Sequence, residues 1–478
     1  MDMSSDDKNF HKCMNILAEA GITPKVYSIE QDKLLKIKPN ILSKINQVRE
    51  IAEKLDCAVA IVGGFARDLI LGEPSEDVDF MIFQGSIEDL TNEIANQLDG
   101  KVGKMSNQTL TTQVRFQDNI VFEFNSTRKE RYEYPSRVPI VENATLVDDL
   151  NRRDFTINTL LMFEKKLIDV FDGLRDLKEG IIKTTRTPST VFHEDYLRMF
   201  RAIRFACRLN FEISEETQMG IRDYVDNILN VPSERILNEL KQSFEYNPLK
   251  AFRLMVGLKI FETMFPEIPN KNLNQDVFTI ETLFEKIAKE IQFLMDSDIK
   301  EIYPFLSLIF KEVKLDVETE DFHQFVFESK LALEIEKILT KYKFSNKEKL
   351  LIHKYIQFSL DIQQFFNEPI TKLKIREYIR ETDPKTQIMI QIFQADQSTR
   401  ISRKNVLEIE KKIAELSKNR GLIFFNTALN GNDIANYFNI KGHEIGKAKK
   451  LLTAAIMSEE INNTKEECIE YLKTNLKS

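Results

Sequence analysis

The sequence predicts an α+β protein in which an N-terminal mixed α/β head, a small sheet with flanking helices, precedes an all-helical neck, body and tail. Three observations predict this class. Short segments rich in Val, Ile and Phe alternate with turn residues between about Asp56 and Thr184. Apolar residues recur at helical spacing from about Pro188 onward. The 478 residues exceed what one hydrophobic core usually supports, so we expect several domains.

The head is expected to contain five strands, because five segments are short, apolar and bounded by turn residues. They cover residues 57–64, 77–83, 112–116, 119–126 and 165–171. Residues 88–100 have the pattern of an amphipathic helix that ends at a glycine. The N-terminal 55 residues are expected to be a helical extension, to which we assign no chemistry.

Beyond the head, strand signals almost vanish. Helices are expected over 193–211, 214–229 and 233–244, and the stretch 250–420 is expected to be helical throughout. The predicted domains are an N-terminal extension (1–40), a catalytic head (41–182), a neck (183–250), a body (251–380) and a tail (381–478).

Composition excludes several classes of protein. Lys and Arg number 67 and Asp and Glu 75, so 67 − 75 gives a net charge of −8. This excludes a uniformly basic surface but leaves room for a local basic cleft. The four cysteines are far apart, which argues against a zinc site or a disulfide framework and suits a reducing compartment. The longest apolar run, near Ile302–Phe310, is far shorter than the roughly 20 residues of a membrane span, so we expect a cytoplasmic protein that contacts no membrane.

The first polar motif is Ile61–Ile82, where a predicted strand ends in Gly63-Gly64 and a second strand carries Asp77 and Asp79. Alternation along a strand puts both carboxylates on one face. Side-by-side carboxylates repel each other unless a cation lies between them, and hard oxygen ligands suit Mg²⁺ bound together with phosphates. The glycines would let backbone N–H groups approach a triphosphate, and Arg67 would add positive charge. A polar strand end is the alternative, and the motifs that follow count against it.

The second motif is Asn151–Leu160, in which Arg153, Asp154 and Asn158 belong to a dense polar cluster. Arginines can neutralise a triphosphate, and Asp or Asn can accept from ribose hydroxyls. A structural network of salt bridges explains this motif equally well.

The third motif is Glu194–Phe205, where Asp195, Arg198, Arg201 and Arg204 recur every three residues along a predicted helix. Three arginines without matching acids imply an anionic partner, although ion pairs on a solvated face are the alternative. An Asp beside an Arg can also recognise the edge of cytosine or adenine, because Asp accepts from the exocyclic amine and Arg donates to the ring.

Together these motifs resemble the class II nucleotidyltransferase family, which contains the tRNA nucleotidyltransferases (CCA-adding enzymes) and bacterial poly(A) polymerases. GGFARDLILG…DVD resembles the catalytic motif, RRDFTIN the ribose-binding motif, EDYLRMFRAIRF the base-selecting motif and SERILNEL the helix that follows in the neck. The resemblance is continuous from about Ile41 to Leu240 and includes a segment similar to the family's flexible loop.

The resemblance implies a role for each matching residue. It implies that Asp77 and Asp79 are catalytic and hold the metal, Mg²⁺. The implied nucleotide-binding residues are Gly63, Gly64, Arg67, Arg153, Asp154, Asn158, Asp195, Arg198, Arg201 and Arg204. The implied flexible-loop residues are Glu123, Arg128, Glu130 and Arg137, and Glu123 is alternatively a third acid of the metal site.

The resemblance further implies addition of CCA to the 3′ end of tRNA from CTP and ATP, with release of pyrophosphate. Leu429–Lys473 resembles the tail of many CCA-adding enzymes, and the loop residues disfavour a CC-only enzyme. An A-adding enzyme and a poly(A) polymerase of the same family remain alternatives, as does a catalytically inactive tRNA-binding protein. The expected partners are the tRNA acceptor end, CTP and ATP, with no stable protein partner.

Overall fold

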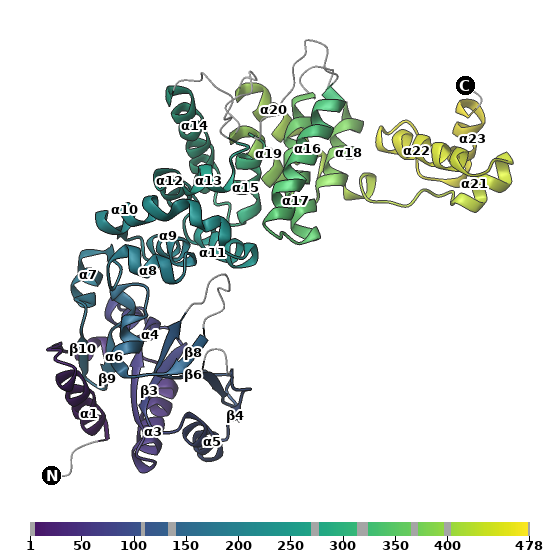
Figure 1. Cartoon of the computed structure of the whole chain (residues 1–478). Coiled ribbons are helices and arrows are strands. Elements are labelled where there is room, and N and C mark those ends of the chain that lie inside the picture. The colour runs from purple at the N-terminus through teal and green to yellow at the C-terminus, as the bar shows by residue number, and fades with distance from the viewer. Residues whose placement is uncertain are drawn as a thin grey trace. The chain divides into compact units, whose positions relative to one another are not determined.

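A computed structural model describes residues 5–106, 110–131, 140–268, 277–312, 324–364, 371–395 and 403–476 (Figure 1). The chain divides into two compact units, Met1–Met264 and Phe265–Ser478. The first unit contains the sheet and the helices that follow it, and the second is helical in its described residues. The predicted class, a mixed α/β head followed by helical regions, is therefore confirmed. The finer five-part division stays a prediction.

The core of the head is an eight-stranded sheet in the order β1-β10-β9-β2-β3-β6-β5-β4. All five predicted strands are present and overlap β2, β3, β5, β6 and β10. The sequence did not predict the shorter strands of the structure. The sheet strands are β1 (Lys25–Ser28), β2 (Ala58–Val62), β3 (Val78–Gln84), β4 (Lys101–Val102), β5 (Thr111–Arg115), β6 (Val121–Ser126), β9 (Leu161–Phe163) and β10 (Lys166–Asp169). Two further pairs are β7 (Arg128–Arg131) with β8 (Ile140–Asn143), and β11 (Ile181–Ile182) with β12 (Glu212–Ile213).

Strands β3 and β6 are parallel neighbours, and their register places Asp79 opposite Glu123. Strand β2 pairs with β3 on the other side and is completely buried. Five buried apolar residues in a row explain why β2 reads as a continuous hydrophobic run rather than an alternating one. The motif glycines follow directly at the end of this central strand.

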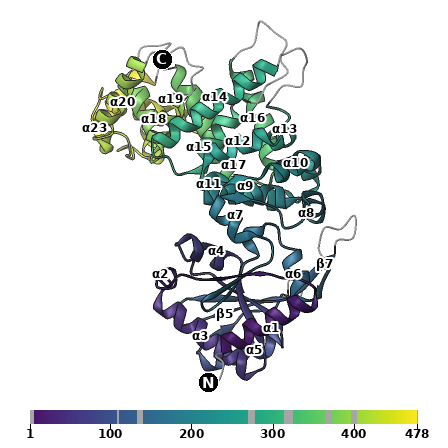
Figure 2. The ribbon, with the colours of Figure 1, turned by 90° about the vertical axis from the view of Figure 1, so that its left-hand side faces the viewer.

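The N-terminal residues are part of the head, and the expectation of a purely helical extension was wrong. After the first helix, strand β1 pairs with β10 at the edge of the sheet. Cys13 and Leu17 on that helix are fully buried against β2, β9 and β10. Figure 2 shows this first helix beside the helices that pack on the sheet. The head helices are α1 (Ser5–Glu19), α2 (Gln31–Leu34), α3 (Pro39–Lys54), α4 (Gly64–Leu71), α5 (Ile87–Gln97), α6 (Leu146–Asn151), η1 (Thr156–Asn158) and α7 (Gly173–Glu179).

Among the helices that follow the sheet, a separate two-stranded parallel sheet, β11–β12, joins Ile182 to Ile213. Most of helix α9 is buried, including Arg198 and Arg204, so these two arginines project into the protein rather than onto an exposed face. These helices are α8 (Pro188–Glu194), α9 (Leu197–Leu209), α10 (Glu215–Tyr224), η2 (Val225–Asn230), α11 (Ser233–Tyr246), α12 (Pro248–Gly257) and α13 (Ile260–Met264).

The second unit consists of helices wherever the structure describes it, as the sequence predicted. Its helices are α14 (Val277–Asp296), α15 (Ile302–Phe310), α16 (Gln324–Lys341), α17 (Asn346–Gln364), α18 (Lys372–Thr382), α19 (Thr386–Ala395), α20 (Arg403–Leu416), η3 (Arg420–Leu422), α21 (Gly431–Phe438), α22 (His443–Met457) and α23 (Lys465–Asn475). The last three helices share a small apolar core that includes Leu429, Leu452 and Leu472. Within the described ranges, no helix is both long enough and apolar enough to cross a membrane.

Candidate active site

A polar cavity of about 590 Å³ lies in the first unit and collects residues from all three sequence motifs. Eleven of the predicted site residues line it. The other five are one arginine directly after α6, three further residues of α9 and one arginine of α11. The lining residues are Gly63, Gly64, Arg67, Asp79, Arg152, Arg153, Asp154, Asn158, Asp195, Leu197, Arg198, Arg201, Arg204, Phe205, Arg208 and Arg235. Eight are arginines and three are aspartates, so a net-acidic chain contains a basic cavity suited to an anion.

The Gly63-Gly64 turn brings the backbone close to the functional side chains. Gly63 has φ of +79° and ψ of −128°, a conformation that residues with a Cβ rarely adopt. A Cβ at Gly63 would lie 3.6 Å from Nη1 of Arg153 and 3.9 Å from Oδ2 of Asp79. The turn therefore places the N-terminus of α4 between an arginine and an acid, where backbone N–H groups can face a phosphate.

Asp79 faces the cavity from β3, and its neighbours make its negative charge costly. Burial raises the pKa of Asp79 to about 7, and the carboxylates of Glu123 and Asp77 add to the rise while Arg153 and Arg67 oppose it. Glu123 accepts hydrogen bonds from Gln113 and Asn125, each at 3.3 Å. An acid in this position is stabilised by an added cation.

Asp77 precedes β3 and is exposed, outside the lining of the cavity. Its backbone N–H donates to Oγ of Ser75 at 2.8 Å, which fixes the turn before the strand. Across the described part of the chain, no three His, Cys, Asp or Glu side chains gather closely enough to form a metal cage. Asp79 on β3, with Asp77 just before the strand, suits a cation that also takes ligands from phosphate, rather than one held by protein alone.

Arg67 and Asn158 lie at the buried side of the cavity. The Arg67 guanidinium donates to Asp68 through Nε and to Oδ1 of Asn158 through Nη1, both at 2.8 Å. Asp68 also accepts from Arg208 at 3.0 Å. Because its partners are protein atoms, Arg67 is anchored within the site and connects the first motif to the second.

Arg152 and Arg153 share one acid that the sequence motifs did not single out. Both donate to the fully buried carboxylate of Asp149, at 2.6 Å from Arg152 and 3.0 Å from Arg153. The spacing of three and four residues along α6 was a usable signal for this pairing. Arg153 also donates to the carbonyl of Asn158 at 3.2 Å, which holds it over the Gly63 turn.

Asp154 is the most completely bonded acid of the site. Its Oδ1 accepts from the amide of Phe155 at 2.8 Å and from Asn158 at 3.0 Å, and its Oδ2 accepts from Nε and Nη2 of Arg201, both at 2.7 Å. Burial alone would raise the pKa of Asp154, but Arg201, Asn158 and Arg198 outweigh it and hold the pKa far below its usual range. Four donors occupy the four acceptor positions of a carboxylate, so Asp154 has none left for a ribose hydroxyl.

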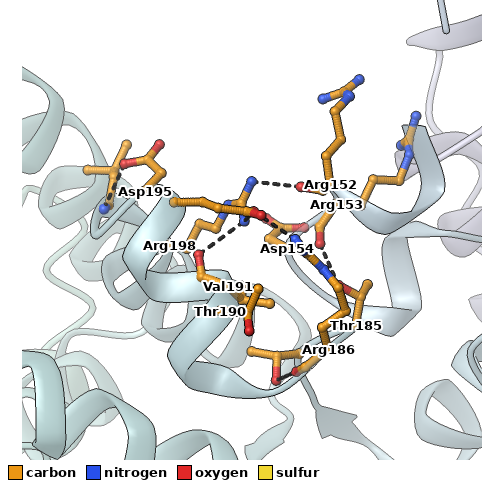
Figure 3. Close-up of polar contacts among 12 residues, drawn as sticks. Arg152, Arg153, Asp154, Thr185, Arg186, Thr190, Val191, Asp195 and Arg198 are labelled. Atoms are coloured by element: carbon orange, nitrogen blue, oxygen red, sulfur yellow. Dashed lines mark hydrogen bonds and ion pairs between the residues drawn. The ribbon is translucent and has the colours of Figure 1, made fainter. Parts of the chain in front are cut away.

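Arg198 joins three segments rather than standing free (Figure 3). Its Nη1 donates to the carbonyl of Val191 at 3.0 Å and to Glu194 at 2.7 Å, and its Nη2 donates to the carbonyl of Arg152 at 2.6 Å. In Figure 3 the Arg198 side chain lies between helix α8 and the backbone of the second motif. Helix α9 is therefore fixed to the segment that carries Arg153 and Asp154.

The expectation that the arginines of the third motif lack matching acids was wrong. Arg201 pairs with Asp154, Arg198 with Glu194, and Arg204 with Glu239 on α11 at 2.6 Å. Glu239 is distant in sequence, so helical spacing within the motif could not reveal it. The excess of positive charge at the cavity is smaller than the sequence suggested.

The predicted loop residues fall partly outside the described structure. Arg128 begins β7 and its Nη1 donates to Oγ1 of Thr111 at 3.3 Å. Glu130 lies on β7, but its side chain and the whole of Arg137 lie outside the described residues. Neither Glu123 nor Arg128 lines the cavity.

Two regions of the chain match known protein families, one in the head and one in the helices that follow it. Residues 59–183 match the family described as Poly A polymerase head domain, and residues 210–271 match the probable RNA and SrmB-binding site of polymerase A. An A-adding tRNA nucleotidyltransferase of Geobacter sulfurreducens is 36% identical over 235 residues, 48% of this chain and 26% of that protein. A CCA-adding enzyme of Lactobacillus helveticus is 31% identical over 246 residues, 51% of this chain and 59% of that protein. The chain thus spans between about a quarter and three-fifths of the length of these curated relatives.

A solved structure extends the likeness to nearly the whole fold. The Thermotoga maritima CCA-adding enzyme complexed with tRNA superimposes with a TM-score of 0.64 at 20% identity, covering 94% of this chain and 99% of that one. At this identity the likeness shows the fold, and it agrees with the mixed α/β head and the helical regions described above. More particularly, residues 59–183 and 210–271 match the two domains named above, and about half of the chain is similar to curated tRNA nucleotidyltransferases.

Proposed function

We propose that this chain adds nucleotides to the 3′ end of tRNA and completes the CCA sequence from CTP and ATP with release of pyrophosphate. The observation that carries the proposal is the convergence of three separate sequence motifs on one cavity that contains eight arginines and three aspartates. A triphosphate fits this charge, and relatives named for CCA addition and A addition support tRNA as the acceptor.

Each group of residues has a distinct task in this proposal. The N–H groups after Gly63 and the guanidinium of Arg153 bind the triphosphate, while Arg67 supports them from the buried side. Asp154 acts by holding Arg201 and Asn158, because its own acceptor positions are filled. Asp195 and Arg198 border the space for the nucleobase.

The acidic side of the cavity fits a divalent cation. Asp79 has a raised pKa beside Glu123, so its neighbours favour an added positive charge, and carboxylate oxygens are the ligands that Mg²⁺ prefers. Asp77 and Asp79 would hold this ion together with phosphate oxygens. When bound, Mg²⁺ supplies positive charge to the reacting phosphate and lowers the pKa of a coordinated hydroxyl.

The geometry also suggests how the chain orients the reaction. With the triphosphate at the Gly63 turn and the base near Asp195, the α-phosphate lies towards the acids on β3. The 3′-hydroxyl of the RNA would then attack in line from the open side of the cavity, and pyrophosphate would leave towards the arginines.

An extension assay tests the proposal. The purified protein with Mg²⁺ receives a tRNA without CCA, a tRNA that ends in CC, or an unrelated oligonucleotide, with each NTP alone and in mixture. We expect three nucleotides added to the first RNA and one to the second, followed by a stop.

Three other outcomes would replace the proposal. Extension of the CC end alone would identify an A-adding enzyme, a candidate favoured by the relative with 36% identity. Long A tails on any RNA would identify a poly(A) polymerase. No extension of any RNA would leave a tRNA-binding protein without this activity.

A further inference from the structure

Arg235 is the residue that helix α11 contributes to the lining of the cavity. Its Nη2 donates to Oδ2 of Asp195 at 2.7 Å, so the acid of the base-selecting motif already has an arginine partner from a different helix. The Arg235 side chain is 44% exposed and that of Asp195 is 17% exposed. The pair therefore lies at the wall of the cavity, with the acid mostly shielded from solvent.

Asp195 keeps acceptor positions that Asp154 has lost. Its Oδ1 accepts from the amide of Leu197 at 3.0 Å and its Oδ2 accepts from Arg235. Since each carboxylate oxygen can accept two hydrogen bonds, one position remains on each oxygen. Asp195 can thus be held in place and still accept a hydrogen bond from a ligand in the cavity.

Two further arginines of the cavity could attract the carboxylate of Asp195 if it were not held in place. Arg198 and Arg201 line the same cavity. Burial lowers the pKa of Arg201, but Asp154, Glu239 and, less strongly, Asp195 outweigh it and raise the pKa. Without Arg235, a single backbone N–H would hold the carboxylate, which could then turn towards either arginine. A carboxylate captured in that way would present fewer free acceptor positions to a base.

We propose that Arg235 is a positioning residue that determines which nucleobases the site accepts, because it fixes the carboxylate of Asp195. This inference rests on the proposed function, since it takes a nucleoside triphosphate as the occupant. Cytosine and adenine would donate their exocyclic amines to Asp195, whereas uracil and guanine would present a carbonyl lone pair to it. Specificity then depends on the carboxylate keeping one orientation, which Arg235 supplies.

The test compares Arg235→Ala, Arg235→Lys, Asp195→Asn and the Arg235→Ala/Asp195→Asn double variant. For each protein, kcat/KM and equilibrium binding are measured for CTP, UTP, ATP and GTP. We expect Arg235→Ala to lower the preference for CTP over UTP, and for ATP over GTP, by about tenfold, and Arg235→Lys to restore part of it. Arg222→Ala is the matched control, because Arg222 is an exposed, hydrogen-bonded arginine on the neighbouring helix α10 and does not line the cavity.

The double variant separates positioning from direct contact. If Arg235 acts through Asp195, adding Arg235→Ala to Asp195→Asn causes no further loss of base preference. An additive loss, or an equal fall in affinity for all four nucleotides, would overturn the inference and assign Arg235 to phosphate binding. An unchanged preference in Arg235→Ala, with the same thermal midpoint as wild type, would also overturn it.

Failure of the proposed function would give a different pattern. A wild-type protein that extends no RNA contradicts the proposed reaction, yet its four nucleotide affinities still report on base preference. The binding comparison between wild type and Arg235→Ala therefore supports or overturns the role of Arg235 without any turnover.

Discussion

Two aspartates that line the same cavity have opposite electrostatic surroundings. Asp79, on β3, lies beside Glu123 and has a pKa raised to about 7. Asp154, after α6, is buried among Arg201, Asn158 and the Phe155 amide, and its pKa is held far below the usual range. The protein itself neutralises Asp154, whereas Asp79 gains from a cation that must come from outside. Asp79 is thus suited to binding a catalytic cation, and Asp154 to holding the protein structure together.

The largest effect is expected at the acidic side. Asp79→Asn and Asp77→Asn should each lower the rate of nucleotide addition by at least about a thousandfold, because the ligands of the divalent ion are lost. Stability should be unchanged or higher in Asp79→Asn, since repulsion from Glu123 disappears. Single-turnover extension and the thermal midpoint measure both effects. A variant that retained a tenth of the wild-type rate would contradict the assignment.

The opposite pattern is expected at Asp154, where stability should fall first. Asp154→Asn leaves the Arg201 guanidinium with only the more distant carboxylate of Glu239, at 3.9 Å, so the free energy of unfolding should decrease by about 3 kcal/mol. Because the folded-state pKa of Asp154 is lowered, its contribution is present above about pH 4 and is lost as the pH falls below that value. Urea denaturation at pH 7 and at pH 3 should show the difference between wild type and variant shrinking. An equal difference at both values would refute the ion pair as its cause.

A smaller effect is expected at the turn between the two sides. Gly63→Ala should cost about 2 kcal/mol of stability, because φ of +79° with ψ of −128° is strained for alanine, and it should weaken nucleotide binding. Gly21→Ala is the control, since Gly21 also has a positive φ, of +72°, but an added Cβ would meet nothing within 4 Å. Calorimetric titration with CTP should show weaker binding by Gly63→Ala than by Gly21→Ala. Equal CTP affinities in the two variants would argue against a phosphate site at Gly63.

The smallest effect is expected at an exposed ion pair of the same head. Asp172 pairs with Lys25 at the surface, where solvent screens the interaction. Asp172→Asn should therefore leave the free energy of unfolding within experimental error of wild type, as urea denaturation can establish. A clear loss would mean that burial is not what distinguishes Asp154.

The sequence predicted much of this site because each motif is local. The glycine turn, Asp79 on β3 and the arginines of α9 could each be placed on a strand or a helix from spacing alone, and the five longer strands were found from their apolar runs. Asp77 was expected on the same strand as Asp79, but β3 begins one residue after it. The resemblance to a known family then linked motifs that are far apart along the chain.

What escaped prediction depends on contacts between distant segments. Glu239 and Arg235 come from α11, and only the packing of that helix against α9 brings them to Arg204 and Asp195. Strand β1 was missed because KVYS is too short to show an alternating pattern, and its pairing with β10 decides its conformation. The four hydrogen bonds that fill the acceptor positions of Asp154 likewise come from two different motifs, so neither motif alone predicts them.

The pairing of β1 with β10 also bears on how the head can be shortened. A truncated protein that began at residue 41 would lack β1, so β10 would become an open sheet edge with unpaired N–H and C=O groups. It would also lack α1, which would uncover the apolar surface that Cys13 and Leu17 now fill. Such a fragment should self-associate more readily than the full chain even though every cavity residue is present, because it exposes apolar surface that α1 now covers.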